Sequence, residues 1–333
     1  MSWLLGRRLG WTKKLVMLWS GIRRSCRASR RCGRLTAADG PSSSEFLAAN
    51  GHGGAMRMDH AEPFEDKDRP EFFVVCGTNV IEGGESIFRL AERVKRIVED
   101  ELGLVLIFKA SWDKANRTCK DGFRGIGMEK GLDSLMAIKQ DLGLNIITDV
   151  HETSQVEFVD KVADVIQIPS FLCRQTDLIT RAAETDKIIN LKRGQFASAT
   201  VMGHAVQKVL QTGNEKVMVC ERGLMFGMDD LVFDPKQLHA LERACGEDTP
   251  IIVDITHSCQ SPPSSFKGSS GGSRDMIPIV GRAAVASGVD GVFIECHENP
   301  ENAPVDGGIQ WPIEKLDPLL RDLIDIARVP RRV

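Results

Sequence analysis

Cationic side chains gather directly after the apolar run 104–108, and this segment offers the clearest chemistry in the sequence. Residues 109–117 read KASWDKANR and contain three cations, Lys109, Lys114 and Arg117. Holding cations near a protein core is costly unless an anion neutralises them, and Lys and Arg are well suited to phosphate. The segment therefore predicts a site for a substrate phosphate or carboxylate.

Two more cations follow the ends of other apolar runs. Lys192 comes after the run 188–191, and Arg222 comes after the run 216–220. A single lysine in such a place can equally be the partner of a structural carboxylate. The four cations Lys109, Lys114, Lys192 and Arg222 come from three runs and are harder to explain in this way, so the set favours a sugar phosphate, an enol phosphate or both.

Asn79, His257, Glu295 and Asp306 form a second set, drawn from the ends of three apolar runs. His, Glu and Asp side chains suit a divalent metal, but Asn is a weak neutral ligand where a tight site would favour Cys or His. A hydrogen-bonded polar network without a metal is therefore favoured over a metal site.

The elements that position these side chains are apolar runs that alternate with helix-like segments. Continuous apolar strands between helical patterns indicate a parallel sheet, and eight such units predict an α/β fold, the (β/α)₈ TIM barrel. An open doubly wound sheet is the alternative, but no GxGxxG motif follows the first run. Barrel enzymes place their active sites at the carboxyl ends of the strands. The eight runs are 72–76, 104–108, 145–150, 164–168, 188–191, 216–220, 251–255 and 291–295.

The overall composition excludes some classes of function. The net charge of −3 argues against broad nucleic-acid binding, and the apolar run 15–19 is too short to span a bilayer. Nine scattered cysteines without a CxxC pair indicate reduced, intracellular thiols. We expect small-molecule substrates, with neither nucleic acid nor a membrane as a partner.

The chain divides into three parts by composition. Residues 1–38 carry ten Arg or Lys and no acid, which predicts a transit peptide for a mitochondrion or plastid. A disordered basic tail, or sequence upstream of a start at Met56 or Met58, would give the same composition. Residues 39–70 predict a flexible linker, and residues 71–333 predict the catalytic barrel. Without the leader, the protein is expected to be soluble and cytoplasmic.

Over residues 72–328 the chain resembles the 3-deoxy-D-manno-octulosonate 8-phosphate (KDO 8-phosphate) synthase family. Within this span, the stretches KRGQF (192–196) and APVDGGIQWP (303–312) look closer to plant-type members than to bacterial ones. The motifs that carry the resemblance are KASWDKANR (109–117), TDVHE (148–152), QIPSFLCRQTDL (167–178), NLKRGQF (190–196), CERGLMFG (220–227), DITHSCQ (254–260), SGGSR (270–274) and FIECH (293–297).

The resemblance implies a transferase that condenses phosphoenolpyruvate with D-arabinose 5-phosphate and water and releases phosphate. It implies a homotetramer, in which Arg174 reaches the sugar-phosphate site of a neighbouring subunit. The implied phosphoenolpyruvate ligands are Lys109, Ser111, Lys114, Gln167, Lys192 and Arg222. The implied arabinose 5-phosphate ligands are Asn116, Arg117, Thr118 and Arg174.

The resemblance also implies catalytic roles. His257 is expected to transfer a proton or position the attacking water, which Asp306 would orient. Lys114, Asn79 and Glu295 complete the implied catalytic set. Within the family, the class with Asn at the position of Asn79 needs no metal, so neither a metal nor another cofactor is expected.

Three positions depart from the family pattern: Trp112 replaces Phe, and Ile126 and Gly308 each replace Pro. Losing a proline loosens a backbone angle without deleting a charged group, so we expect tuned activity rather than lost activity. The nearest rival function is the related synthase that uses erythrose 4-phosphate. A metal-dependent barrel hydrolase and a barrel kept as a structural or regulatory subunit are the other rivals.

Overall fold

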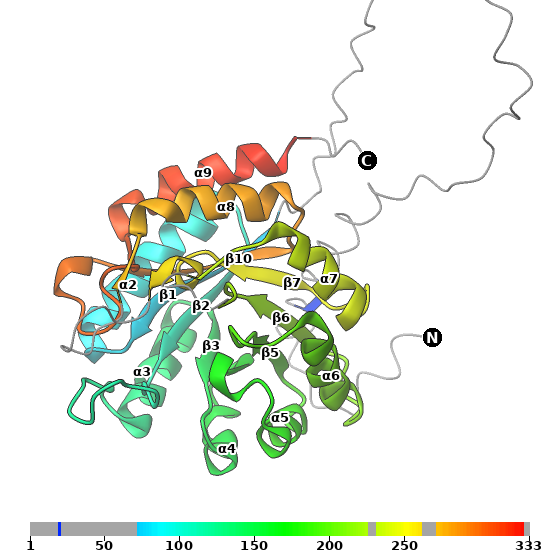
Figure 1. The fold of residues 1–333 in the computed structure, drawn as a ribbon. Coiled ribbons are helices and arrows are strands. Elements are labelled where there is room, and N and C mark those ends of the chain that lie inside the picture. The colour runs from blue at the N-terminus through cyan, green and yellow to red at the C-terminus, as the bar shows by residue number, and fades with distance from the viewer. Residues whose placement is uncertain (1–18, 21–71, 226–230, 262–270, 330–333) are drawn as a thin grey trace, which may run out of the picture.

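Eight parallel strands close into a barrel in the computed structural model, which describes residues 19–20, 72–225, 231–261 and 271–329 (Figure 1). The sheet order is β1-β2-β3-β4-β5-β6-β7-β10, and β1 closes the ring by pairing with β10 from Phe73 opposite Gly291. The predicted TIM barrel is confirmed. The strands are β1 (Phe73–Val80), β2 (Leu106–Ser111), β3 (Asn145–Asp149), β4 (Val165–Ile168), β5 (Ile188–Lys192), β6 (Val217–Glu221), β7 (Ile251–Asp254) and β10 (Gly291–His297).

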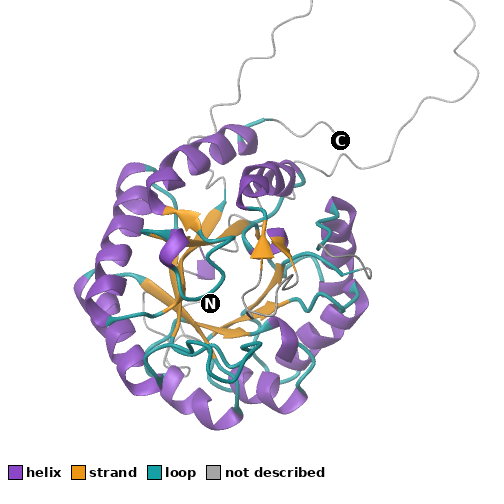
Figure 2. Cartoon of the chain, turned by 60° about the vertical axis from the view of Figure 1, so that its left-hand side comes forward, coloured by secondary structure: helices purple, strands orange, loops and turns teal. Residues whose placement is uncertain are grey.

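Helices form a ring around the barrel (Figure 2). Each helix buries one apolar stripe, as α2 does with Ile87, Leu90 and Val94. In α7 the Asp234 side chain caps the helix and Pro235 occupies its first turn, where proline is tolerated. The helices are α2 (Gly84–Lys95), continued by a π-helix (Arg96–Glu101), α3 (Met128–Asp141), α4 (Val156–Val159), α5 (Thr176–Ala183), α6 (Ala199–Leu210), α7 (Pro235–Cys245), α8 (Ile277–Ala286) and α9 (Leu316–Ala327).

Short elements decorate the carboxyl ends of the last strands. β8 (Gln260–Ser261) and β9 (Gly271–Gly272) form a small antiparallel pair, and β11 (Trp311–Pro312) extends the sheet beside β10. The segment 262–270, which includes the first residue of the SGGSR stretch, and all of the predicted linker 39–70 lie outside the described residues. Among the helices that the structure describes, none is both long and apolar enough to cross a membrane.

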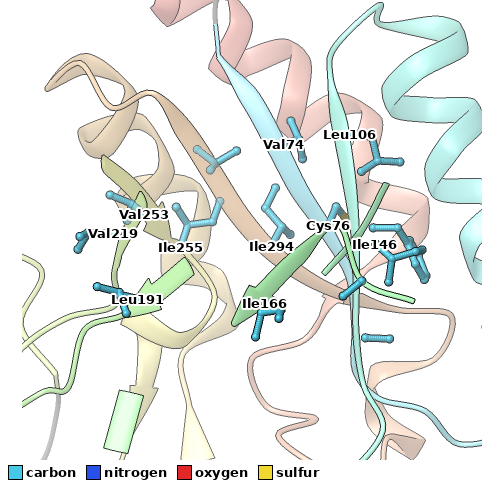
Figure 3. Close-up of a cluster of buried hydrophobic side chains, with 14 of the residues drawn as sticks. Val74, Cys76, Leu106, Ile146, Ile166, Leu191, Val219, Val253, Ile255 and Ile294 are labelled. Atoms are coloured by element: carbon cyan, nitrogen blue, oxygen red, sulfur yellow. The ribbon is translucent and has the colours of Figure 1, made fainter. Parts of the chain in front are cut away.

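The core has two layers, which follow from the alternation of side chains along each strand. An outer cluster between strands and helices includes Val74, Leu106 and Ile146 (Figure 3). An inner cluster includes Phe73, Ile107 and Phe293. The inner cluster also contains Trp19, which is only 5% exposed. A residue of the predicted basic leader therefore packs against the barrel strands.

Candidate active site at the carboxyl ends of the strands

Inward-facing side chains change from apolar to polar along most of the barrel strands. Because side chains alternate between two faces, Lys109 and Ser111 of β2 share the inward side with Ile107. Glu295 of β10 shares it with Phe293 in the same way. The polar residues come last in each strand, so they meet at the carboxyl mouth of the barrel. The other inward polar residues are Asp149 (β3), Gln167 (β4), Asn190 and Lys192 (β5), and Asp254 (β7).

Two of the four strand-end cations have carboxylate partners. The Lys109 ammonium donates to Glu295 and to the carbonyl oxygens of Thr78 and Asn79, at 3.2 and 3.1 Å. The Lys192 ammonium lies 2.6 Å from Asp254 Oδ2. Burial alone raises the pKa of Glu295, but His257 in its protonated form and the Lys109 ammonium outweigh it and hold that pKa well below its usual range. The sequence left open whether these lysines pair with structural carboxylates. In the structure, Lys109 and Lys192 both do.

Lys114 and Arg222 differ, because no carboxylate of the described residues lies within ion-pair distance of either. Lys114 Nζ donates to Ser111 Oγ at 3.1 Å. Burial, followed by the nearby Lys109 ammonium, lowers the pKa of Lys114 to about 8. Arg222 is buried and donates to Gln260 Oε1 at 2.6 Å, while its Nε atom has no hydrogen-bond partner among the described residues. The described residues thus leave the positive charges of Lys114 and Arg222 without a paired anion, which favours binding of an anionic ligand.

Asp149 organises the wall between these cations. It accepts hydrogen bonds from Ser111 Oγ and Gln167 Nε2, and its backbone oxygen accepts from the Trp112 indole at 2.9 Å. Burial alone raises the pKa of Asp149, but the ammonium groups of Lys109 and Lys114 outweigh it and lower that pKa to about 2. Asp149 therefore stays ionised and holds Ser111 and Gln167 in place. Trp112, one of the three departures, adds a hydrogen bond that Phe lacks.

Asn79 joins two carboxylates of the second set. Its Nδ2 atom lies 2.5 Å from Glu295 Oε2 and 3.1 Å from Asp306 Oδ2. Because carboxylates only accept hydrogen bonds, the amide nitrogen of Asn79 must face them. His257 Nε2 lies 3.5 Å from Glu295 Oε2 and 3.9 Å from Asp306 Oδ2. Asn79 therefore hydrogen-bonds to both carboxylates, and His257 lies within ion-pair distance of both. That this polar network works without a metal stays a prediction.

Asp306 is held in an uncommon backbone conformation. Its φ is 50°, in the left-handed region that a residue with a Cβ adopts at a cost of about 1 kcal/mol or more. Gln260 Nε2 donates to Asp306 Oδ1 at 3.2 Å, while Gln260 Oε1 accepts from Arg222. Gln260 thus links the Arg222 guanidinium to Asp306 of the polar network. The predicted mobility of this loop through Gly308 stays a prediction.

Two connected cavities open over these groups. The inner one, about 170 Å³, is lined by Lys109, Gln167 and Lys192. The outer one, about 350 Å³, is lined by Asn116, Arg117, Thr118 and Asp306. Lys114, Arg222 and His257 line both cavities.

The predicted sugar-phosphate residue Arg174 lies apart from the others. It is exposed at the start of α5, where its carbonyl oxygen accepts from Lys208, and it lines neither cavity. Its role across a subunit boundary stays a prediction.

Sequence reasoning missed two buried carboxylates, Asp149 and Asp254, and the linking amide Gln260. The available signal was the two-residue alternation, since Asp149 and Asp254 share the inward side of their strands with Ile147 and Ile252. Ile126, another departure, packs against the outer cluster at the base of the loop before α3.

Comparison with known proteins places this geometry in a family. The model described as the DAHP synthetase I family matches residues 64–327. The chain belongs to this family. Two similar relatives are the "2-dehydro-3-deoxyphosphooctonate aldolase 2" of Arabidopsis thaliana, 52% identical over 264 residues, and the "2-dehydro-3-deoxyphosphooctonate aldolase" of Pisum sativum, 51% identical over 264 residues. These matches cover 78% of this chain and 89% and 90% of the relatives.

A bacterial relative is similar over nearly the same span. The "2-dehydro-3-deoxyphosphooctonate aldolase" of Nitratidesulfovibrio vulgaris (strain DP4) is 43% identical over 251 residues, which cover 75% of this chain and 90% of the relative. The matched family span contains the whole barrel and every residue that lines the two cavities.

Proposed function

We propose that this protein condenses phosphoenolpyruvate with D-arabinose 5-phosphate and water, giving 3-deoxy-D-manno-octulosonate 8-phosphate and phosphate. The observation that carries the proposal is the pair Lys114 and Arg222, two cations without carboxylate partners among the described residues, which line both cavities. Two anionic substrates that must meet need such cations between them. The printed names of the plant and bacterial relatives point to the same product.

Phosphoenolpyruvate is assigned to the inner cavity. Its phosphate and carboxylate would contact Lys114 and Arg222, with Lys109, Gln167 and Lys192 completing the wall. Ser111 would hold Lys114 in place through its hydrogen bond. C3 of the enol then forms a bond to the sugar aldehyde carbon, whose oxygen gains a proton, and the oxygen of water adds to C2. The resulting phosphohemiketal breaks its C2–O bond and releases phosphate. Fixing both reactants in this way lowers the barrier by as much as about 7–11 kcal/mol.

Arabinose 5-phosphate is assigned to the outer cavity. Asn116, Arg117 and Thr118 line it, and the Nε atom of Arg117 is buried without a hydrogen-bond partner in the part of the chain that the structure describes. A phosphate ligand would satisfy that donor. Arg174 would come from a neighbouring subunit of a homotetramer, since in its own chain it lies outside both cavities.

The reaction is assigned to the class that needs no metal. The Asn79 amide nitrogen stands between the Glu295 and Asp306 carboxylates, where it supplies a hydrogen-bond donor to both. His257 would exchange a proton with the water that adds to C2, and Asp306 would orient that water. Activity should then survive EDTA, and Asn79→Cys should create a requirement for Mn²⁺ or Zn²⁺. Loss of wild-type activity on chelation, restored by either ion, would contradict this assignment.

The enzyme is further assigned to the plant type, in the biosynthesis of cell-wall carbohydrate. Identity of 51–52% to the two plant relatives, against 43% to the bacterial one, supports this. A plastid or mitochondrial address is proposed from the basic composition of residues 1–38. Trp19 packs in the inner cluster, so we place the cleavage site of the transit peptide before residue 19.

The function is tested by measuring phosphate release from phosphoenolpyruvate with each of two aldoses, arabinose 5-phosphate and erythrose 4-phosphate, with and without EDTA. We expect release with the five-carbon sugar only. Release with erythrose 4-phosphate alone would support the rival synthase. If neither aldose gives phosphate release, and the Lys114→Ala variant still fulfils the protein's biological role, the barrel would be a structural or regulatory subunit.

A further inference from the structure

We propose that Asp254 is a positioning residue that fixes Lys192 and His257 relative to each other and places the proton of the neutral imidazole on Nδ1. The inference rests on the proposed function, because it concerns the same reaction. Asp254 ends β7, and its side chain is 0% exposed. Sequence reasoning assigned it no role.

One oxygen of Asp254 holds both functional groups. Oδ2 lies 2.6 Å from Lys192 Nζ and 2.7 Å from His257 Nδ1. Those two nitrogen atoms are themselves only 3.4 Å apart. Since Lys192 comes from β5 and His257 from the loop after β7, this single oxygen joins two sides of the barrel mouth.

The other oxygen anchors the carboxylate to its own loop. Oδ1 accepts from the backbone nitrogen of His257 at 2.8 Å, and from the nitrogen and hydroxyl of Thr256 at 3.1 and 2.8 Å. Asp254 therefore receives five donors and has a fixed orientation. Burial alone lowers the pKa of Lys192, but the Asp254 carboxylate outweighs it and raises that pKa above its ordinary value.

The contact with Asp254 decides which imidazole nitrogen faces the reaction. An ionised carboxylate is only an acceptor, so His257 Nδ1 must carry a hydrogen. In the neutral ring Nε2 is then unprotonated and points towards Glu295 and Asp306, at 3.5 and 3.9 Å. His257 is thereby arranged to accept a proton at Nε2, as an imidazole oriented by a buried aspartate does in catalytic triads.

The matched pair of variants is Asp254→Asn and Asp164→Asn. Asp164 is also a buried carboxylate beside a lysine, 2.9 Å from Lys139 Nζ, but it adjoins the amino-terminal end of β4. Asn at 254 keeps an acceptor for the loop yet presents a donor to His257 Nδ1, which moves the proton to Nε2. We expect Asp254→Asn to lower kcat by about 10²–10⁴-fold with the KM for arabinose 5-phosphate within about twofold of wild type. Asp164→Asn should lower the melting temperature alone.

A second background separates positioning from general structural damage. If Asp254 acts on the reaction chiefly through the imidazole, it has little left to act on once His257 is replaced. Adding Asp254→Asn to His257→Gln should then lower kcat by no more than about 10-fold, since the effects of residues that act together are not additive. Equal losses in the two backgrounds, or wild-type kcat for Asp254→Asn, would overturn the inference.

A readout that does not depend on activity keeps this test separate from that of the proposed function. The ¹⁵N spectrum of ring-labelled enzyme, with His257 assigned by its absence in His257→Gln, should show a protonated Nδ1 in the wild type. It should show a protonated Nε2 in Asp254→Asn. A wild-type ring protonated at Nε2 alone would contradict the role of Asp254, whichever substrates the enzyme uses.

Discussion

Replacing Lys114 by Met should destroy activity and stabilise the protein. The ammonium lies in the wall of both cavities, beside Lys109 and without a carboxylate partner among the described residues. Its pKa falls from 10.5 to about 8, which corresponds to about 3 kcal/mol against the charged form. Because water still partly screens the Lys114 side chain, we expect Lys114→Met to raise the free energy of unfolding by only roughly 1–2 kcal/mol.

The assay compares thermal unfolding and turnover of Lys114→Met with those of the wild type at pH 7. A gain of this size should raise the melting temperature by roughly 2–8 °C, while kcat/KM falls by about 10²–10³-fold or more. Phosphoenolpyruvate should raise the melting temperature of the wild type but not of the variant. Lys130→Met, which replaces an exposed lysine of α3, is the control and should change neither property. A variant that melts below the wild type and still responds to phosphoenolpyruvate would refute the reasoning.

Three further predictions concern the same molecule. First, since a lysine must be protonated to bind an anion, kcat/KM for phosphoenolpyruvate should fall as the pH rises through about 8, where free Lys114 loses its proton; a flat profile to pH 9.5 (roughly thirtyfold in proton concentration past that midpoint) would be inconsistent with this. Second, Arg117→Ala should raise the KM for arabinose 5-phosphate about 10-fold or more with little effect on kcat; a loss confined to kcat would reverse the assignment of the two cavities. Third, Trp19→Ala should destabilise the protein by about 3 kcal/mol, measured by denaturant unfolding against the exposed neighbour Ser20→Ala; equal stability of the two variants would show that Trp19 is dispensable to the inner cluster.

The barrel could be predicted because its pattern is local. Each strand is a short apolar run such as 104–108, and each is followed by an amphipathic helix, so counting the units was sufficient. Helix boundaries are harder to predict: α4 covers only Val156–Val159 after a turn of 3₁₀-helix. Such boundaries depend on capping and packing rather than on the apolar pattern.

The cations of the site could be predicted, but their partners could not. Lys109 meets Glu295 across 186 residues of sequence, and that pairing exists only because β1 closes on β10. Lys192 meets Asp254 for a similar reason, since β5 and β7 flank the same strand. Which lysines remain free for a ligand is therefore set by barrel closure and register, not by spacing along the chain.

The proposed condensation can be followed with phosphoenolpyruvate that carries ¹⁸O in the oxygen between C2 and phosphorus. Mixed with arabinose 5-phosphate and the full chain, it should give one phosphate per eight-carbon acid, and ³¹P spectra should find the label in the phosphate. That result requires addition of water at C2 followed by cleavage of the C2–O bond. No consumption of arabinose 5-phosphate, or label retained in the sugar acid, would contradict the account.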